Sequence, residues 1–280
     1  MLKPFDGIHF FLMFIGCPYS GHSLIGSLLD AHPHMIIAHE YNLLAKLEKS
    51  GGDNAVEDVF RGLYKNSRSH KGKRIQTGYD YTVPHQFQGA HRDPLRVIGD
   101  KKGGDTTLKF IENHGAALKI FDAFKAKIKI PVKLIHVTRN PYDNISAMAL
   151  HAYAKRKKTN YSQLPFDPDN PLRDRGLLNE KTDRYFQHAK KNMDLLKSGM
   201  GDGYTLRSEN FIKNPEKELK KICSFLGQPA DEGYLEDCAS IVYDKPHKSR
   251  FRVRWTQEMI KKTALCIEEY DFLSGRRYDE

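Results

Sequence analysis

Glycine, proline and hydroxyl side chains between residues 16 and 23 have a spacing that suits the binding of a phosphate group. Gly16 and Gly21 are separated by four residues, and His22 and Ser23 follow directly. In the pattern G-x-x-x-x-G-K-[ST], backbone N–H groups cradle phosphates and the lysine reaches the β- and γ-phosphates. Because His22 stands where this lysine should be, the loop suits a phosphate-bearing ligand better than a nucleoside triphosphate.

An apolar segment precedes this loop and a helical pattern follows it. Residues 8–15 are apolar except for His9, which is typical of a buried strand in a parallel sheet. After the loop, helical spacing places Leu24, Ile25 and Leu28 on one face. A strand, a loop and a helix in this order present backbone N–H groups and the positive end of the helix dipole to an anion. An ordinary glycine turn between a strand and a helix is the alternative.

The overall composition favours an anionic partner. The 280 residues include 45 Lys and Arg against 35 Asp and Glu, a formal net charge of +10. This excess suits a nucleotide, a nucleic acid, a sulfated or phosphorylated substrate, or an acidic membrane surface. A hydrophobic content of 39% with 11% aromatic residues excludes a largely disordered chain. No apolar run approaches the roughly 18 residues that a membrane span requires.

We expect a cytoplasmic protein without a metal site. The four cysteines are compatible with a reducing cytosol, although one disulfide among them would also fit the sequence. No C-x-x-C pair and no metal-type cluster with histidine occurs among Cys17, Cys223, Cys238 and Cys266. The apolar segment near the start has an acidic residue, Asp6, before it and no A-x-A-like site after it. We therefore expect this segment to be a strand and not a signal peptide.

Strand-like and helix-like patterns alternate along the chain, which predicts one α/β domain over residues 1–280 with a central parallel sheet flanked by helices. The other strands are expected at residues 35–38, within 96–104, at 132–138 and at 204–207. Helices are expected at 43–49, 55–64, 116–128, 142–154, 177–197, 214–226 and 255–270. Residues 65–73 are expected to be a solvated loop, and Thr106 or Thr107 is expected to cap a helix. The irregular segment 155–176 is long enough to be a lid.

Four landmarks in a fixed order resemble the sulfotransferases that use 3′-phosphoadenosine 5′-phosphosulfate (PAPS). Residues 18–24 (PYSGHSL) are similar to the 5′-phosphosulfate loop P-[KR]-[ST]-G-[ST]-[TS]-[LW], and residues 139–143 (RNPYD) to the 3′-phosphate motif R-[ND]-P-x-[DE]. Residues 209–227 resemble the segment Y-E-D-L-x-x-x-P…F-L-G, and the basic stretch 245–255 takes the place of a cofactor loop. The resemblance implies a P-loop-like sulfotransferase fold, PAPS as donor, 3′-phosphoadenosine 5′-phosphate (PAP) as product, and no catalytic metal.

The resemblance also implies which residues hold the donor. The 5′ end is assigned to Tyr19, Ser20, Gly21, His22 and Ser23. The 3′-phosphate is assigned to Arg139, Ser146, Lys248, Ser249 and Arg250. The chain departs from the family pattern at three positions. The loop lysine or arginine is Tyr19, the usual hydroxyl residue eight positions after the arginine is Ala147, and the tyrosine before the glutamate is Ser208.

The catalytic residues are expected at the ends of two strands. Lys101, Lys102 or His22 would replace the missing loop cation at the leaving phosphate. Glu40 follows the predicted strand 35–38, where tyrosylprotein sulfotransferases have a glutamate base, and His39 is the alternative base. Partial burial beside a charged donor is expected to move the pKa of Glu40 toward the working range.

The predicted function is transfer of a sulfuryl group from PAPS to a hydroxyl or amine of a small organic or carbohydrate acceptor. Residues 79–87 and 155–176 are expected to shape the acceptor pocket. A nucleotide kinase or NTPase of the P-loop plan and an inactive PAP-binding homologue are the alternatives. A nucleic-acid-binding protein would also fit the charge, but no DNA- or RNA-binding motif accompanies it, so we expect no nucleic-acid partner. The sequence does not determine the oligomeric state.

Overall fold

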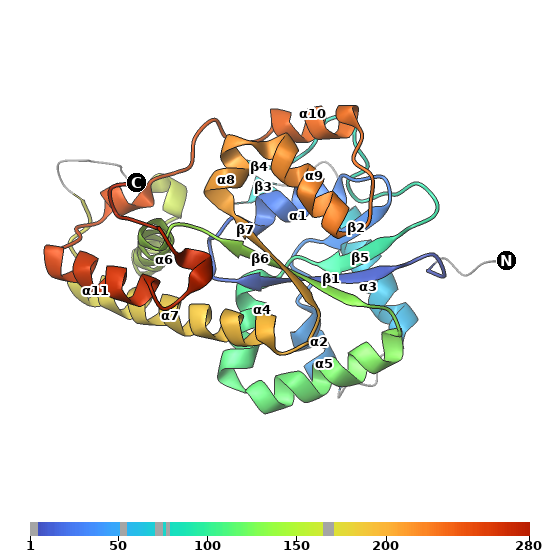
Figure 1. Ribbon diagram of the computed structural model, residues 1–280, viewed down its shortest axis with the longest axis horizontal. Coiled ribbons are helices and arrows are strands. Elements are labelled where there is room, and N and C mark those ends of the chain that lie inside the picture. The colour runs from blue at the N-terminus through green and yellow to red at the C-terminus, as the bar shows by residue number, and fades with distance from the viewer. Residues whose placement is uncertain (1–4, 51–54, 71–74, 77–78, 165–170) are drawn as a thin grey trace.

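In a computed structural model, the apolar segment before the glycine loop forms the central strand of a five-stranded parallel sheet (Figure 1). The structure describes residues 5–50, 55–70, 75–76, 79–164 and 171–280. The strand order is β2-β5-β1-β6-β7, and neighbouring strands pair in parallel. The strands are β1 (Phe10–Gly16), β2 (Met35–Ala38), β5 (Val97–Asp100), β6 (Val132–Thr138) and β7 (Asp202–Arg207). These positions confirm the predicted parallel sheet.

Helices connect the strands and follow the last one. They are α1 (His22–Asp30), α2 (Leu43–Lys49), α3 (Val56–Ser69), α4 (Gly103–Glu112), α5 (His114–Ile128), α6 (Pro141–Arg156), α7 (Arg175–Lys197), α8 (Ser208–Lys213), α9 (Pro215–Phe225), α10 (Glu232–Ser240) and α11 (Gln257–Ile267). Short 3-10 turns form η1 (Tyr161–Gln163), η2 (Ser249–Arg252) and η3 (Asp271–Leu273). A small antiparallel pair, β3 (Ile75–Gln76) and β4 (Tyr79–Asp80), lies outside the main sheet. The sequence did not predict α8, α10 or this pair.

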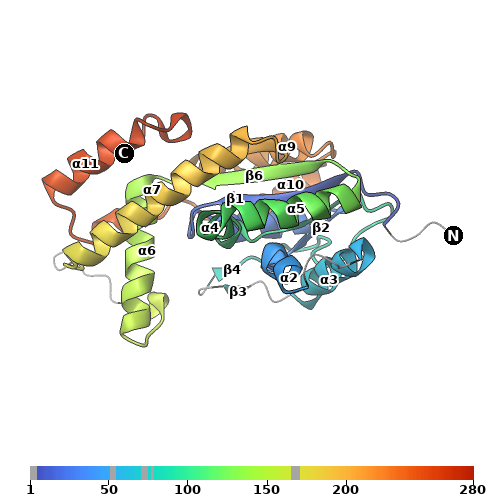
Figure 2. The ribbon, with the colours of Figure 1, turned by 90° about the horizontal axis from the view of Figure 1, so that it is seen from below.

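Helices cover both faces of the sheet, which is why β1 is apolar along its whole length. Successive side chains of a strand point to opposite faces. Phe11 and Met13 pack in a core cluster with residues of α2, α3 and α5, whereas Leu12 and Phe14 pack with residues of α1, α9 and α10. Figure 2 shows α2 and α3 on the opposite side of the sheet from α9 and α10. The chain is thus a single α/β domain, as predicted.

Two helix boundaries differ from the expected ones because of contacts that are distant in sequence. Helix α3 continues to Ser69 through most of the predicted loop 65–73, since Ser67 is buried and donates a hydrogen bond to Asp30 at 2.6 Å. Residues 71–74 lie outside the described part of the chain. Helix α4 begins at Gly103, so Thr106 and Thr107 lie inside it, where both hydroxyls bond to backbone carbonyls of the first turn.

The strand order reverses beside β1, and this arrangement brings three loops together. Parallel strands end at one edge of the sheet, and ligands of open α/β sheets bind at that edge where the strand order reverses. Here the loops after β1, β5 and β6 lead into α1, α4 and α6. Residues 165–170 of the predicted lid lie outside the described residues. In the part of the chain that the structure describes, no helix combines the length and apolar character needed to cross a membrane.

Candidate active site

A cavity of about 350 Å³ opens where the loops after β1, β5 and β6 meet. Nine of the predicted site residues line it: Tyr19, Ser20, Gly21, His22, Ser23, Glu40, Lys101, Arg139 and Ser249. The predicted ends of the donor site therefore share one hollow of the molecule. The cavity lies in the size range of small-molecule sites.

The glycine loop presents the start of α1 to this cavity. Gly21 is the N-cap residue with φ 104°, a left-handed conformation that glycine adopts without strain, and its N-cap position carries no side-chain hydrogen bond. The first N–H groups of a helix have no acceptor within the helix. An uncapped helix start of this kind is a ready site for an anion.

Asn144 of α6 holds the loop in this conformation. Its Nδ2 donates to the carbonyl of Pro18 at 2.6 Å, and its Oδ1 accepts from the hydroxyl of Ser20 at 2.8 Å. The Asn144 side chain is fully buried. Sequence reasoning missed this residue, although it follows the motif 139–143 directly.

Lys101 delivers a positive charge to the loop from the end of β5. Its Nζ donates to Ser23 Oγ at 3.0 Å and to Glu40 Oε1 at 3.1 Å, and the side chain is 2% exposed. The stem of Lys101 lies across Gly26, where a Cβ atom would come within 2.4 Å of Lys101 Cγ. Gly26 thus lets the lysine cross α1 and place its ammonium at Ser23.

Glu40 lies between two lysines at the same end of the cavity. Its second oxygen accepts from Lys102 Nζ at 2.9 Å, and Lys102 also pairs with Asp105 at 3.1 Å. Burial favours the neutral carboxyl, but the ammonium groups of Lys101 and Lys102 outweigh it and lower the pKa of Glu40 to about 2. The two lysines thus hold the pKa of Glu40 below the working range in this structure, and the rise expected beside a charged donor stays a prediction.

Arg139, between β6 and α6, lines the same cavity. Its guanidinium donates to the carbonyl of Tyr19 at 3.3 Å, to the carbonyl of His247 at 2.5 Å and to Ser249 Oγ at 3.0 Å. These bonds tie the segment around η2 to the glycine loop. A planar guanidinium in this place suits two-point binding of a phosphate.

Two groups of aromatic rings also line the cavity. Tyr19 stacks on His151 of α6 with ring centroids 4.1 Å apart, and His151 stacks on Tyr161 of η1 at 4.2 Å. A second group, beside Arg139, consists of Tyr79, Tyr81, Tyr243 and His247. Two of its members come from the aromatic segment 79–87, and Tyr161 comes from the predicted lid.

A comparison with protein families identifies the chain. The model of the sulfotransferase family matches residues 12–232, well over half of the sequence. The chain belongs to the sulfotransferase family. It is therefore a member of an enzyme family that uses PAPS, as the four landmarks predict. A search of curated proteins gives no match for the sulfotransferase.

One solved sulfotransferase domain shows the same fold. The sulfotransferase domain from the curacin biosynthetic pathway is 14% identical, with a TM-score of 0.52 over 95% of this chain and 98% of that chain. Sulfotransferase STF9 from Mycobacterium avium is 13% identical, with a TM-score of 0.49 over 96% and 78% of the two chains. A mouse sulfotransferase complexed with PAP is 12% identical, with a TM-score of 0.46 over 93% and 84%. The likeness to the curacin-pathway domain confirms the predicted sulfotransferase architecture.

Three predicted donor ligands of this sulfotransferase do not line the cavity: Ser146, Lys248 and Arg250. Ser146 Oγ accepts from Trp255 Nε1 at 3.0 Å in the buried face of α6. Lys248 Nζ donates to the Glu280 carbonyl, and Arg250 forms a buried ion pair with Asp143 at 2.7 Å. In this structure the three side chains bind protein groups, so we exclude them from the donor ligands proposed below.

His22 of the sulfotransferase lines the cavity but does not supply a cation. Its ring is buried between Gly16 and Gly103, where added Cβ atoms would approach Nε2 to 2.6 and 2.5 Å. Burial lowers the pKa of His22 to about 4, and Nε2 lies 3.2 Å from the carbonyl of Ile15. The ring is therefore neutral near pH 7 and donates to that carbonyl. Among the described residues, no group of three or more His, Cys, Asp or Glu side chains could hold a metal ion.

The lowered pKa of Glu40 predicts how the stability of the sulfotransferase depends on pH. A carboxyl whose pKa is lowered from 4.5 to about 2 on folding contributes stability above pH 4.5, and loses it as the pH falls toward 2. We expect wild type to exceed Glu40→Gln in free energy of unfolding at neutral pH, and the excess to shrink below pH 4.5. Urea unfolding of both proteins over a pH series measures this. An excess that stays constant down to about pH 2 would contradict the pairing.

Proposed function

We propose that this sulfotransferase moves a sulfuryl group from PAPS to a hydroxyl or amine of a small organic or carbohydrate acceptor. The proposal rests on one observation: the uncapped start of α1, the ammonium of Lys101 and the guanidinium of Arg139 all line one cavity. PAPS has anionic groups at its 5′ and 3′ ends, and the cavity offers positive groups for both.

The described residues fit a nucleotide of this shape. The helix start and Lys101 form an anion cradle, and Lys101 is too deeply buried to act as a solvated surface charge. Arg139 and Ser249 offer N–H and O–H donors for the 3′-phosphate. Tyr79, Tyr81 and Tyr243 line the same cavity, and their aromatic rings offer apolar faces against which the adenine base can pack.

The chemistry that PAPS supplies is a sulfuryl group whose departure leaves PAP. As the bond between sulfur and the acceptor oxygen or nitrogen forms, the bond between sulfur and the 5′-phosphate oxygen breaks. Lys101 and the N–H groups of the first turn of α1 stabilise the charge that grows on that oxygen. Glu40 accepts the proton of the acceptor hydroxyl or amine.

Donor binding would prepare Glu40 for this role. In this structure, Lys101 and Lys102 both form ion pairs with Glu40. A phosphosulfate at the start of α1 competes with Glu40 for Lys101, because Lys101 already contacts Ser23 there. Loss of that partner raises the pKa of Glu40 and makes it a stronger base.

Calorimetry with PAP and with ATP tests this function against a kinase. We expect tight PAP binding without Mg²⁺ and no tight, Mg²⁺-dependent binding of ATP. The opposite result would favour a kinase or NTPase.

A screen of phenols, alcohols, amines and sugars with labelled PAPS then identifies the acceptor. PAP binding without transfer to any of them would favour an inactive homologue.

Arg139→Ala is expected to weaken PAP binding by about ten- to hundredfold, since hydrogen bonds to a charged group contribute about 1.5–3 kcal/mol. Binding of adenosine 5′-monophosphate (AMP), which lacks the 3′-phosphate, serves as the matched control and should change little. Calorimetric titration of wild type and variant with both nucleotides gives the two ratios. Equal losses for PAP and AMP would remove Arg139 as the 3′-phosphate ligand.

A further inference from the structure

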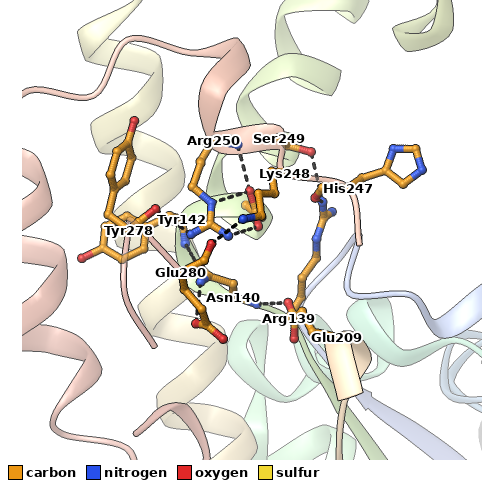
Figure 3. Close-up of polar contacts among 12 residues, drawn as sticks. Arg139, Asn140, Tyr142, Glu209, His247, Lys248, Ser249, Arg250, Tyr278 and Glu280 are labelled. Carbon is orange, nitrogen blue, oxygen red and sulfur yellow. Dashed lines mark hydrogen bonds and ion pairs between the residues drawn. The ribbon is translucent and has the colours of Figure 1, made fainter. Parts of the chain in front are cut away.

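The last residues of the sequence lie beside the Arg139 end of the cavity. Residues 276–280, called the strap below, follow η3 and contact α6, α8 and the segment around η2. Figure 3 shows Tyr278 and Glu280 next to Asn140 and Arg250. The ring of Tyr278 packs against Tyr142, with centroids 5.4 Å apart at an interplanar angle of 86°. The strap is therefore packed into the domain and is not a loose tail.

Arg276 connects the strap to the residue that follows Arg139. Its Nη2 pairs with Glu209 Oε2 at 2.6 Å, and both side chains are largely buried, with 2% and 11% exposed. The other oxygen of Glu209 accepts the backbone N–H of Asn140 at 2.6 Å. Asn140 also contacts the strap directly, because its Nδ2 donates a hydrogen bond to the carbonyl of Arg277 at 2.9 Å. This closed set of bonds fixes the backbone directly after Arg139.

Arg250 connects the strap to the other partner of Arg139. Its guanidinium forms a two-point ion pair with Asp143, at 3.0 Å through Nε and 2.7 Å through Nη2. Its remaining nitrogen, Nη1, donates to the carbonyls of Arg277 and Tyr278 at 2.9 and 2.7 Å. Arg250 lies next to Ser249, whose hydroxyl accepts from Arg139. The strap thus supports Arg139 from both sides.

Asp143 and Glu209, the acidic residues of the two motifs, bind the arginines that connect the strap to the region around Arg139. The side chains of Asp143 and Glu209 are 2% and 11% exposed. The Asp143 carboxylate pairs with Arg250, and the Glu209 carboxylate binds Arg276 and the backbone N–H of Asn140. Buried carboxylates need such partners, because an unpaired buried charge is strongly unfavourable. Neither carboxylate is available to a ligand, and both would repel a phosphate.

We propose that the strap positions the 3′-phosphate grip of the sulfotransferase, with Arg276 and Arg250 as positioning residues that hold Arg139, Asn140 and Ser249 in place. This inference rests on the proposed use of PAPS. It predicts that loss of strap contacts weakens recognition of the 3′-phosphate alone. The 5′ loop, which Asn144 and Lys101 hold, should keep its affinity.

Arg276→Met tests the proposal, with Arg277→Met as the matched control. Both variants lose one positive charge, but the Arg277 side chain is exposed, and the network uses its backbone carbonyl. For Arg276→Met we expect PAP affinity to fall by about ten- to hundredfold, as when a partner that orients a ligand-binding side chain is removed. The AMP affinity of Arg276→Met and both affinities of Arg277→Met should stay close to those of wild type.

Fluorescence of Trp255, the single tryptophan, provides a second readout. Trp255 is 7% exposed and its ring lies 6.2 Å from that of Tyr278. We expect Arg276→Met to increase quenching of Trp255 by acrylamide at unchanged far-UV circular dichroism. If Arg276→Met unfolds, Glu209→Gln/Arg276→Met removes both charges together and is measured instead.

The outcomes separate this inference from the proposed function. Wild type that fails to bind PAP overturns the proposed function. If wild type binds PAP and Arg276→Met binds it equally well, the strap proposal alone is overturned. Equal loss of PAP and AMP affinity would mean that the strap stabilises the whole site, and would also overturn it.

Discussion

Lys101→Met is expected to lower kcat by about 10²- to 10³-fold, the loss typical of removing one donor that stabilises transition-state charge. Methionine keeps the apolar stem that crosses Gly26 but removes the ammonium at Ser23. Affinity for PAPS should fall by a smaller factor than kcat, because the full charge on the 5′-phosphate oxygen develops only as the sulfuryl group leaves. Steady-state kinetics with a saturating acceptor, together with calorimetry, gives both values.

Two further variants make the Lys101 result specific. Lys102→Met removes an ammonium that pairs with Glu40 and Asp105, so its kcat should fall much less. His22→Asn removes a ring that is already neutral near pH 7, and the shape of the pH–rate profile should not change. If Lys101→Met keeps kcat within a few-fold of wild type, Lys101 is not the replacement for the missing loop cation.

Glu40→Gln is expected to lower kcat by about 10²- to 10⁴-fold, the usual contribution of general acid–base catalysis. The amide keeps the size of the side chain but cannot accept the proton of the acceptor. PAP affinity should stay the same or rise, because Lys101 and Lys102 lose a competing carboxylate. This opposite direction of the two effects distinguishes loss of a base from general damage to the site.

Asp105→Asn is the matched control for Glu40→Gln. Asp105 also lines the cavity and pairs with Lys102, at 3.1 Å, so the two variants remove the same charge from neighbouring places. Asp105→Asn should keep most of the turnover of wild type. Full turnover in Glu40→Gln would exclude Glu40 as the base, and His39→Ala would then test the alternative.

The elements around the 5′ loop could be predicted from sequence because local rules govern them. The continuous apolar run of β1 indicates a strand covered on both faces, and Gly21 allows the left-handed turn before α1. Pro141 at the start of α6 places that helix directly after Arg139. Each of these signals acts within a few residues of the element that it predicts. The expectation that the loop and Arg139 hold one ligand came from the resemblance to the sulfotransferases, and in the structure both line the same cavity.

The roles of individual charged side chains depended on contacts that no local pattern contains. Lys101, Lys102 and His22 were all candidates for the loop cation, and the sequence did not show that the fold brings Lys101 to Ser23 and buries His22. Glu40 was expected to have its pKa raised beside a charged donor, whereas in this structure the two lysines that follow β5 lower it. Desolvation and pairing act over a few ångströms in space, and residues 40 and 101 are far apart in the chain.

Contacts between residues far apart in the sequence also decided which residues near the predicted 3′-phosphate site face the cavity. Motif similarity assigned Ser146, Lys248 and Arg250 to the donor, whereas the structure gives each of them a protein partner. By itself, the sequence determined the sheet, the 5′ loop and the position of Arg139, because apolar periodicity, glycine and proline act locally. The tertiary structure decided which charges face the cavity and which support it, because the energy of a buried charge depends on the partner that folding brings to it.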